Sequence, residues 1–298
     1  MSAALPEGTA ILLIGHGSVN RAEDIPAFVS AIRRGRPTPQ AIVDEVTHRW
    51  NAIGGSPLHD INVQTARALS ERVSAPVAVA GRLWAPYAKD VVAELSRGGS
   101  RRVISLPLAP YSAKIYNDVT RLACVAAGVE CLDVGAWGTH PSLIAGFAEA
   151  IEEARRGVDA KGAHVVLTAH SLPMRVVAMG DTYEQEVRAT ARAVTERLAL
   201  SPDRAHVAFQ SQGMDGGDWL GPDLKTTFET LAAKGASDVV VCAIGFLADH
   251  TEVLYDLDVE AKAMVERHGM KFHRAPSLNS RKRLLDALED LARRCLAG

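Results

Sequence analysis

Short apolar runs alternate with amphipathic helical patterns from one end of the chain to the other, and this alternation restricts the fold more than any other feature. A short apolar run followed by a helix predicts a strand of a parallel sheet with helices on both faces. The predicted strands are 10–14, 77–80, 103–106, 164–168, 206–209 and 239–243. The predicted helices between them include 63–73, 143–155, 185–198 and 224–234. The sequence therefore predicts an α/β fold with doubly wound parallel sheets.

The two halves of the chain repeat one pattern. The first half opens with AILLIGHGS and the second with HVVLTAHSL, which places His16 and His170 at matching strand ends. Further along, SRRVISLPLAP in the first half corresponds to SDVVVCAIGF in the second. We therefore expect two similar Rossmann-like domains, 1–150 and 151–275. The remaining segment, 276–298, is predicted to form a terminal helix that could pack back on the first domain.

Composition and charge exclude several classes of protein. Of the 298 residues, 47% are hydrophobic and 23% are charged, which is typical of a globular protein with substantial cores. The formal net charge of -2 gives no basic field that would attract nucleic acid. The longest apolar stretch, 239–248, is too short to span a bilayer, and the N-terminus lacks an apolar signal core. We expect a cytoplasmic protein without an integral membrane segment.

The cysteines indicate a reducing compartment. None of them forms a CxxC pair, so the sequence predicts neither a zinc knuckle nor a disulfide framework. Distant cysteines could still converge on an iron–sulfur cluster, an alternative that we do not favour. We expect no permanently bound cofactor. The cysteines are Cys124, Cys131, Cys242 and Cys295.

Three carboxylates recur at helical spacing in the segment GFLADHTEVLYDLDVE, residues 245–260. Glu252, Asp256 and Glu260 fall at i, i+4 and i+8, which aligns them along one face of an α-helix. Like charges at this spacing repel, so the row is costly unless cations compensate, and carboxylates suit weakly held divalent metals. A solvated acidic face is the alternative. The segment follows a buried strand, however, which places it at the edge of the sheet where ligands bind.

Two histidines stand at equivalent strand ends, His170 in LTAHSLP and His16 in GHGS. A neutral imidazole can accept a proton or bind a metal near neutral pH, although a single histidine is more often structural. Two of them at matching carboxyl ends of strands favour a functional role. No GxSxG elbow occurs that would make Ser171 a nucleophile, and P-loop and GxGxxG motifs are absent as well. Serine-hydrolase and nucleotide chemistry are therefore disfavoured.

A basic cluster, Arg33, Arg34 and Arg36, ends the helical pattern AEDIPAFVSAIRRG. Guanidinium forks could capture carboxylates. A cationic cap at the C-terminal end of a helix is the simpler interpretation, because the helix dipole favours it. On spacing alone we prefer the cap.

Seven motifs in a fixed order give a resemblance to a known family. The chain resembles the ferrochelatases, particularly the soluble bacterial type that handles coproporphyrin, over nearly its whole length. The resemblance implies two Rossmann-like domains of the chelatase superfamily that enclose a porphyrin. The motifs are IRRGRPTP (32–39), RWNAIGGSPL (49–58), AHSLP (169–173), GDTYEQ (180–185), FQSQG (209–213), WLGPD (219–223) and GF.ADH.EVLYD (245–256).

The resemblance also implies roles for individual residues. By this resemblance His170 and Glu252 face the metal and deprotonate the pyrroles. Asp256 and Glu260 match an acidic row that passes metal inward, while His16 would contact the metal from the opposite side. The substrate-binding candidates, around the propionates and the cleft mouth, are Arg33, Arg49, Trp50, Ser56, Tyr116 and Trp219.

The implied function is that of a lyase, a ferrochelatase of haem biosynthesis that inserts Fe2+ into a porphyrin. Coproporphyrin III is favoured over protoporphyrin IX. The expected partners are the porphyrin and Fe2+ and not nucleic acid, and the protein would be a monomer or a homodimer.

Several departures from the family pattern border the substrate. His16 stands where the coproporphyrin type usually carries tyrosine, and GHGS resembles the small cobalt and sirohydrochlorin chelatases. The IGGSPL and LAPYSAKIY loops are shorter than usual, and LWAP lacks a histidine common there. Two alternatives therefore stay open: a cobalt, nickel or sirohydrochlorin-type chelatase, and a non-catalytic porphyrin or haem carrier. The presence of His170 together with the acidic row disfavours the carrier.

Overall fold

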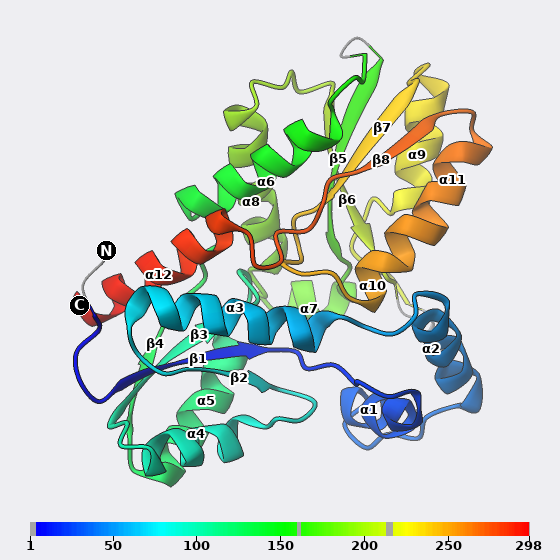
Figure 1. Cartoon of the computed structure of the whole chain (residues 1–298). Coiled ribbons are helices and arrows are strands. Elements are labelled where there is room, and N and C mark those ends of the chain that lie inside the picture. Colours follow the sequence, from blue (N-terminus) through cyan, green and yellow to red (C-terminus); the bar gives the residue numbers. More distant parts are fainter. Residues whose placement is uncertain (1–3, 160–161, 213–216, 298) are drawn as a thin grey trace. The chain divides into compact units, whose positions relative to one another are not determined.

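The structure is a computed structural model in which contacts divide the chain into two compact units. The described residues are 4–159, 162–212 and 217–297. Unit 1 comprises residues 1–137, 248–251 and 279–298, and unit 2 comprises residues 138–247 and 252–278. Each unit has its own four-stranded parallel sheet with helices on both faces (Figure 1). The predicted fold class is confirmed.

In unit 1 the first strand occupies an inner position of the sheet. The strands are β1 (Thr9–Gly15), β2 (Val77–Gly81), β3 (Arg102–Pro107) and β4 (Glu130–Asp133). Their order is β2-β1-β3-β4, and every pair is parallel. β1 is buried at each of its positions, because it has a strand on either side and helices above and below. This burial explains its unbroken apolar sequence.

The helices of unit 1 form two layers around this sheet. They are α1 (Ile25–Ile32), α2 (Gln40–Ala52), α3 (Leu58–Val73), α4 (Ala88–Arg97), α5 (Lys114–Ala127) and α12 (Lys282–Ala297), with a short 3₁₀ turn, η1 (Ala22–Asp24). α3 and α12 cover one face, and α4 and α5 cover the other (Figure 1). A separate small cluster joins α1 to α2, where Ile25 and Val29 pack with Trp50 and Trp84.

Unit 2 repeats the topology of unit 1. Its strands are β5 (Ala163–His170), β6 (Ala205–Gln210), β7 (Asp238–Ala243) and β8 (Lys271–Arg274). Their order is β6-β5-β7-β8, again with every pair parallel. The second residue of β3 pairs with Ala10, and the second residue of β7 pairs with His164. Six residues further on, His16 and His170 therefore occupy equivalent places at the carboxyl ends of β1 and β5.

The helices of unit 2 also lie on both faces of the sheet. They are α6 (Pro141–Ala154), α7 (Met174–Ala178), α8 (Tyr183–Arg197), α9 (Leu224–Ala233), α10 (Thr251–Leu254), the π-helix η2 (Asp256–Ala261) and α11 (Lys262–Arg267). α6 and α8 cover one face, while α9 and α11 cover the other (Figure 1). Between the sheet and the layer of α9 and α11 lies a core in which Phe228, Val241 and Val265 are fully buried.

The division between the units falls earlier than the sequence suggested. We placed it at residue 150, whereas contacts place it between Trp137 and Gly138. The Trp137 indole donates to the Pro107 carbonyl of β3, and the Gly138 carbonyl accepts a hydrogen bond from Thr190 of α8. α6 therefore belongs to unit 2, where it packs on α8 and β7.

The end of the chain returns to unit 1. α12 packs against α3, β3 and β4. Arg72 of α3 lies 2.8 Å from the Asp286 carboxylate of α12, in a partly buried ion pair. Residues 248–251 join the same unit, because the side chain of Asn279 bonds both the backbone and the carboxylate of Asp249 at 2.9 Å.

Candidate functional site

The candidate site of unit 2 lies where the strand order reverses. The next two strands along the chain, β6 and β7, lie on opposite sides of β5, and ligands of such sheets bind at this point, beyond the carboxyl ends of the strands. His170 is the last residue of β5. The chain after β7 crosses close to it: a Cβ on Gly245 would lie 2.7 Å from the Cα of Ala169, so only glycine fits there. The segment that carries the acidic row therefore starts beside His170.

The hydrogen bonds of His170 define which ring nitrogen can accept a proton. Its Nδ1 is bonded to the backbone carbonyl of Ser171, and a carbonyl can only accept. Nδ1 therefore carries the proton in the neutral ring, which leaves the lone pair on Nε2. Nε2 faces the Glu252 carboxylate, whose Oε2 lies 3.7 Å away, and the two side chains are 35% and 44% exposed. This pair can take up a proton and stabilise the resulting imidazolium.

Ser171 has a structural role. Its side chain is fully buried, and its hydroxyl donates to the Leu220 carbonyl at 2.7 Å. A hydroxyl in this state is not available as a nucleophile, which agrees with the absence of the GxSxG motif.

The acidic row is not carried by one regular α-helix, and in this respect the expectation from its spacing is wrong. α10 ends at Leu254, and a π-helix follows in which the N–H of Glu260 bonds the Tyr255 carbonyl, five residues back, at 3.1 Å. The wider turn changes the direction of the side chains that follow it. The spacing of four residues does not distinguish the two kinds of helix.

The three carboxylates also differ in environment. Asp256 is 5% exposed and accepts a hydrogen bond from the Ser211 hydroxyl, whereas Glu252 and Glu260 are partly exposed. The middle carboxylate of the row is therefore buried and hydrogen-bonded, and the two at its ends are partly exposed. Among the described residues, no three His, Cys, Asp or Glu side chains form a ready-made metal cage. The structure brings His170 and Glu252, two of the predicted metal-handling residues, into contact.

In unit 1, His16 follows β1 in an exposed position. The N–H groups of Arg82 and Leu83 extend the pairing beyond the strand, bonding the carbonyls of Gly15 and His16 at 2.9 Å. Gly17 has a φ of +93°, and a Cβ there would lie 2.9 Å from the Trp84 nitrogen, so glycine is required. The GHGS motif thus makes a tight turn against the segment 82–84.

Trp50 and Ser56 carry buried polar atoms that have no hydrogen-bond partner among the residues that the structure describes. These are the indole Nε1 and the hydroxyl Oγ. The loop between them brings Gly55 against the Trp50 ring, since a Cβ on Gly55 would lie 3.1 Å from it. Orphaned buried donors are rare in native proteins and often mark a missing ligand. This pair could donate to an acceptor such as a carboxylate.

The basic residues predicted near the substrate already have local contacts. Arg33 is the C-cap residue of α1, and its Nε donates to the Pro37 carbonyl at 3.1 Å. Arg36 donates to the Arg33 carbonyl at 3.1 Å. Arg49 on α2 is paired with Glu45 at 2.6 Å. Both Arg33 and Arg49 belong to unit 1.

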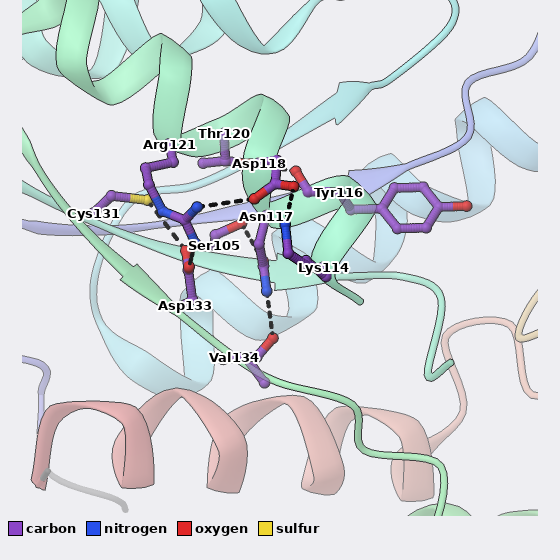
Figure 2. A network of polar contacts seen from close by, with 10 residues as sticks. All are labelled: Ser105, Lys114, Tyr116, Asn117, Asp118, Thr120, Arg121, Cys131, Asp133 and Val134. Atoms are coloured by element: carbon purple, nitrogen blue, oxygen red, sulfur yellow. Dashed lines mark hydrogen bonds and ion pairs between the residues drawn. The ribbon is translucent and has the colours of Figure 1, made fainter. Parts of the chain in front are cut away.

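Tyr116 and Trp219, the remaining candidates, lie in different units. Tyr116 on α5 is 9% exposed, and the Arg82 guanidinium carbon lies 5.9 Å from the centre of its ring. Figure 2 shows this ring pointing away from the polar network of the same helix. Trp219 is partly exposed and forms an isolated bridge with Pro173 in the segment after His170.

Sequence reasoning missed two sets of residues near these strand ends. Gln210 stands in the FQSQG motif without an assigned role, and the structure buries it beside His170. Gly213 of that motif lies outside the described residues. His59 and Asn62 of α3 line a small pocket with Ser18, beside the turn after β1. Their only sequence signal is proximity to the SPL motif.

Comparison with known proteins agrees with this architecture. The solved structure of SirB from Bacillus subtilis with Fe3+ matches with a TM-score of 0.63 at 17% sequence identity, covering 97% of this chain and 96% of that one. The match establishes the chelatase fold. None of the helices in the described part of the chain is long and apolar enough to cross a membrane.

The sequence comparisons are more specific. The ferrochelatase family model matches residues 8–296. A ferrochelatase from Acidobacterium capsulatum is 35% identical over 97% of this chain and 94% of its own length. A coproporphyrin III ferrochelatase from Bacillus cereus is 30% identical, with 94% and 92% covered. This chain belongs to the ferrochelatase family, the porphyrin metal chelatases of the lyase class.

Proposed function

We propose that this protein inserts Fe2+ into a porphyrin and that coproporphyrin III is its preferred substrate. The observation that carries the proposal is the His170–Glu252 pair, in which the Nε2 lone pair of a tautomer fixed by the Ser171 carbonyl faces a carboxylate at 3.7 Å. Metal insertion has to remove two pyrrole N–H protons, and this pair provides a proton acceptor and a group that stabilises the charge it gains.

The proposed chemistry assigns one step to each group. His170 accepts the two pyrrole protons one after the other at Nε2 as the metal displaces them, and the first is passed on before the second is taken up. Glu252 stabilises the imidazolium and holds the incoming cation, since carboxylate oxygens suit ferrous iron. Asp256 and Glu260 carry metal toward the ring or protons away from it. His16 contacts the metal from the other side of the macrocycle.

The preference for coproporphyrin III is supported by donors for carboxylates. Coproporphyrin III carries more propionate groups than protoporphyrin IX and therefore needs more hydrogen-bond donors. The unpartnered Nε1 of Trp50 and Oγ of Ser56 provide two buried ones. Arg33 and Arg49 add guanidinium groups, and Tyr116 and Trp219 provide aromatic contacts. A relative named coproporphyrin III ferrochelatase, 30% identical to this chain, supports the same preference.

One observation favours a second candidate. His16 in GHGS replaces the residues usual in either ferrochelatase type, and this motif resembles the small cobalt and sirohydrochlorin chelatases. The alternative activity is insertion of cobalt or nickel into an acid-rich tetrapyrrole of the sirohydrochlorin kind. A carrier that binds porphyrin without metallating it is the remaining alternative.

The proposal is tested by an anaerobic spectroscopic assay of the purified protein. Ferrous iron is supplied with either coproporphyrin III or protoporphyrin IX, and loss of the free-base spectrum is followed. We expect turnover of both, faster with coproporphyrin III. No iron insertion, together with turnover of sirohydrochlorin and cobalt, would transfer the assignment to the second candidate. Tight porphyrin binding without turnover of any metal would indicate a carrier.

A matched pair of variants links the activity to the site. Glu252→Gln removes the charge beside His170 and should abolish turnover while porphyrin still binds. Glu266→Gln makes the same change further along the segment, at an exposed residue of α11 paired with Lys262, and should leave turnover unchanged. Equal activity of both variants would contradict the role of Glu252.

A further inference from the structure

We infer that Gln210 is a positioning residue that holds Glu252 at its working distance from His170. Gln210 ends β6, is 3% exposed, and pairs in register with His170 of the neighbouring strand. Its side chain joins the two segments that supply the site. The inference rests on the proposed function, since it assigns Gln210 a part in the same reaction.

The Gln210 side chain makes one hydrogen bond in each direction. Its Nε2 donates to the backbone carbonyl of Glu252 at 3.0 Å. Its Oε1 accepts from the Thr168 hydroxyl at 3.1 Å, and Thr168 is fully buried. Thr168 lies two residues before His170, so both side chains project from the same face of β5. These two hydrogen bonds, from Thr168 through Gln210 to Glu252, form a strut. It connects the strand that carries His170 to the residue that carries the facing carboxylate.

The orientation of the amide follows from its acceptor. The Glu252 carbonyl has no proton to offer, so only the NH₂ end of Gln210 can face it. The opposite orientation would bring two carbonyl oxygens together in a buried place, where unsatisfied acceptors are costly. The amide therefore has one orientation, and its two hydrogen bonds fix the backbone of Glu252 relative to β5.

The adjacent residue, Ser211, holds the same segment at a second point. Its hydroxyl donates to the carboxylate of Asp256, four residues beyond Glu252. Ser211 has a φ of +60°, a conformation that is uncommon for residues other than glycine. Two consecutive residues at the end of β6 thus bind the acidic segment at both ends of its first turn.

This arrangement predicts a specific kinetic defect. If the strut is removed, Glu252 drifts from Nε2 of His170, and misplacement by about 1 Å can cost about a hundredfold in rate. Porphyrin affinity should change little, because the Gln210 side chain has both of its hydrogen bonds within the protein. Loss in kcat without loss of porphyrin binding separates positioning from a general weakening of the fold.

The test uses a matched pair of variants in the full chain. Gln210→Met removes both bonds with a side chain of similar size. Unit 1 contains the same bridge: the Ser105 hydroxyl donates to the Asn117 amide oxygen at 2.7 Å, and the Asn117 amide nitrogen donates to the Val134 carbonyl at 2.8 Å (Figure 2). Asn117→Leu is therefore a control for the loss of one buried amide bridge. Thr168→Val removes only the far bond of the strut and should give an intermediate defect.

We expect Gln210→Met to lower kcat for metal insertion by about 10- to 100-fold, as loss of an outer-shell partner commonly does, with porphyrin affinity within threefold of the native value. Asn117→Leu should keep kcat within threefold of the native value while lowering the unfolding temperature by about as much as Gln210→Met does. Equal kcat for the two variants, at equal unfolding temperatures, would overturn the inference.

A second readout does not depend on turnover. Amide hydrogen exchange should rise over residues 252–261 in Gln210→Met, relative to the native chain and to Asn117→Leu, because the segment has lost its anchor. This readout separates the inference from the proposed function, since it applies even to a chain that metallates nothing. Unchanged exchange in this segment would overturn the positioning role.

Discussion

Unit 1 and unit 2 build the same sheet, with strand orders β2-β1-β3-β4 and β6-β5-β7-β8, and each places a histidine at the carboxyl end of its first strand. The surroundings of these two histidines differ. In unit 2, His170 lies 3.7 Å from the Glu252 carboxylate, in the segment that follows the third strand. In unit 1 the segment after the third strand is LAPYSAKIY, which contains no acidic residue. His16 instead ends in an exposed turn packed on Trp84.

The repeated topology thus places a histidine at the ligand edge of each sheet, and the segment after the third strand determines the chemistry of that histidine. A carboxylate beside the ring supports proton transfer, because it stabilises the imidazolium. The two halves are therefore expected to contribute unequally to one reaction.

The largest expected effect separates the two histidines. His170→Ala should lower kcat by about 10²- to 10⁴-fold, the usual contribution of a general base, with porphyrin binding retained. His16→Ala should mainly raise the metal concentration needed for half-maximal rate. Steady-state kinetics at varied Fe2+ measure both. Similar losses of kcat in the two variants would contradict the division of roles.

The next effect concerns the close approaches that shape the two strand ends. A Cβ at Gly245 would lie 2.7 Å from Ala169, and one at Gly81 would lie 2.2 Å from the Trp84 carbonyl oxygen. Alanine at either position should destabilise its unit by about 1–3 kcal/mol, the usual cost of overpacking. Urea unfolding measures the change. Gly135→Ala is the control, since a Cβ there meets nothing within 4 Å, and a comparable loss in it would invalidate the steric argument.

A smaller effect depends on pH and belongs to unit 2 alone. His164 and His206 are bonded to each other at 2.9 Å, and Arg204 lies 3.1 Å from the other nitrogen of His164. Burial lowers the pKa of both histidines below the ordinary value. The charge of Arg204 lowers the pKa of His164 further. The pKa of His206 is lowered further by His164 and Lys234. Asp203 raises the pKa of both histidines. The equivalent positions of unit 1 are Ala10 and Ala78.

The sign of this effect follows from the lowered pKa values. At any pH between the lowered pKa values of the folded chain and the unfolded value of about 6.5, the unfolded chain binds more protons than the folded one. The contribution to stability is full above about pH 6.5 and is lost as the pH falls through the folded pKa values. The unfolding temperature, followed from about pH 8 to about pH 5, should therefore fall less steeply in the double variant His164→Ala/His206→Ala. An equally steep fall in that variant would exclude the pair as the cause.

The smallest change in unfolding free energy is expected from the loss of one cation–π contact in each unit. Arg82 lies over Tyr116 at 5.9 Å, and Arg188 lies over Phe209 at 5.7 Å. Methionine at either arginine should cost about 0.5–1 kcal/mol of unfolding free energy, measured in denaturant. Only Arg82→Met should also weaken porphyrin binding, because Tyr116 is a proposed substrate contact. Equal porphyrin affinity in both variants would argue against that contact.

Local patterns in the sequence were sufficient to predict the inner strands and both strand-end histidines. The strands β1, β3, β5 and β7 are buried and apolar over most of their length, so their signal is strong. β4 and β8 were missed. Each has four residues, at the edge of a sheet, with partly exposed polar side chains, and such segments carry little periodicity.

The features that the sequence did not predict depend on contacts between distant residues. Asp258 in the π-helix is paired with Arg274 at 2.6 Å. The spacing of residues within the segment does not predict this pair, because Arg274 lies in the strand β8. The bonds of Gln210 to Thr168 and to Glu252 each span 42 residues. The orphaned donors of Trp50 and Ser56 are evident only once their burial is known. Motif recognition located these neighbourhoods, and geometry was needed to assign their contacts.

The return of the chain from unit 2 to unit 1 has a consequence for biosynthesis. α12 completes the layer that covers β3 and β4, yet a ribosome makes it only after all of unit 2 has been synthesised. Unit 2 can therefore close while the half of the protein that was translated first still exposes apolar surface under α12. The N-terminal half, although it is the first to leave the exit tunnel, is the one that depends longest on protection from aggregation.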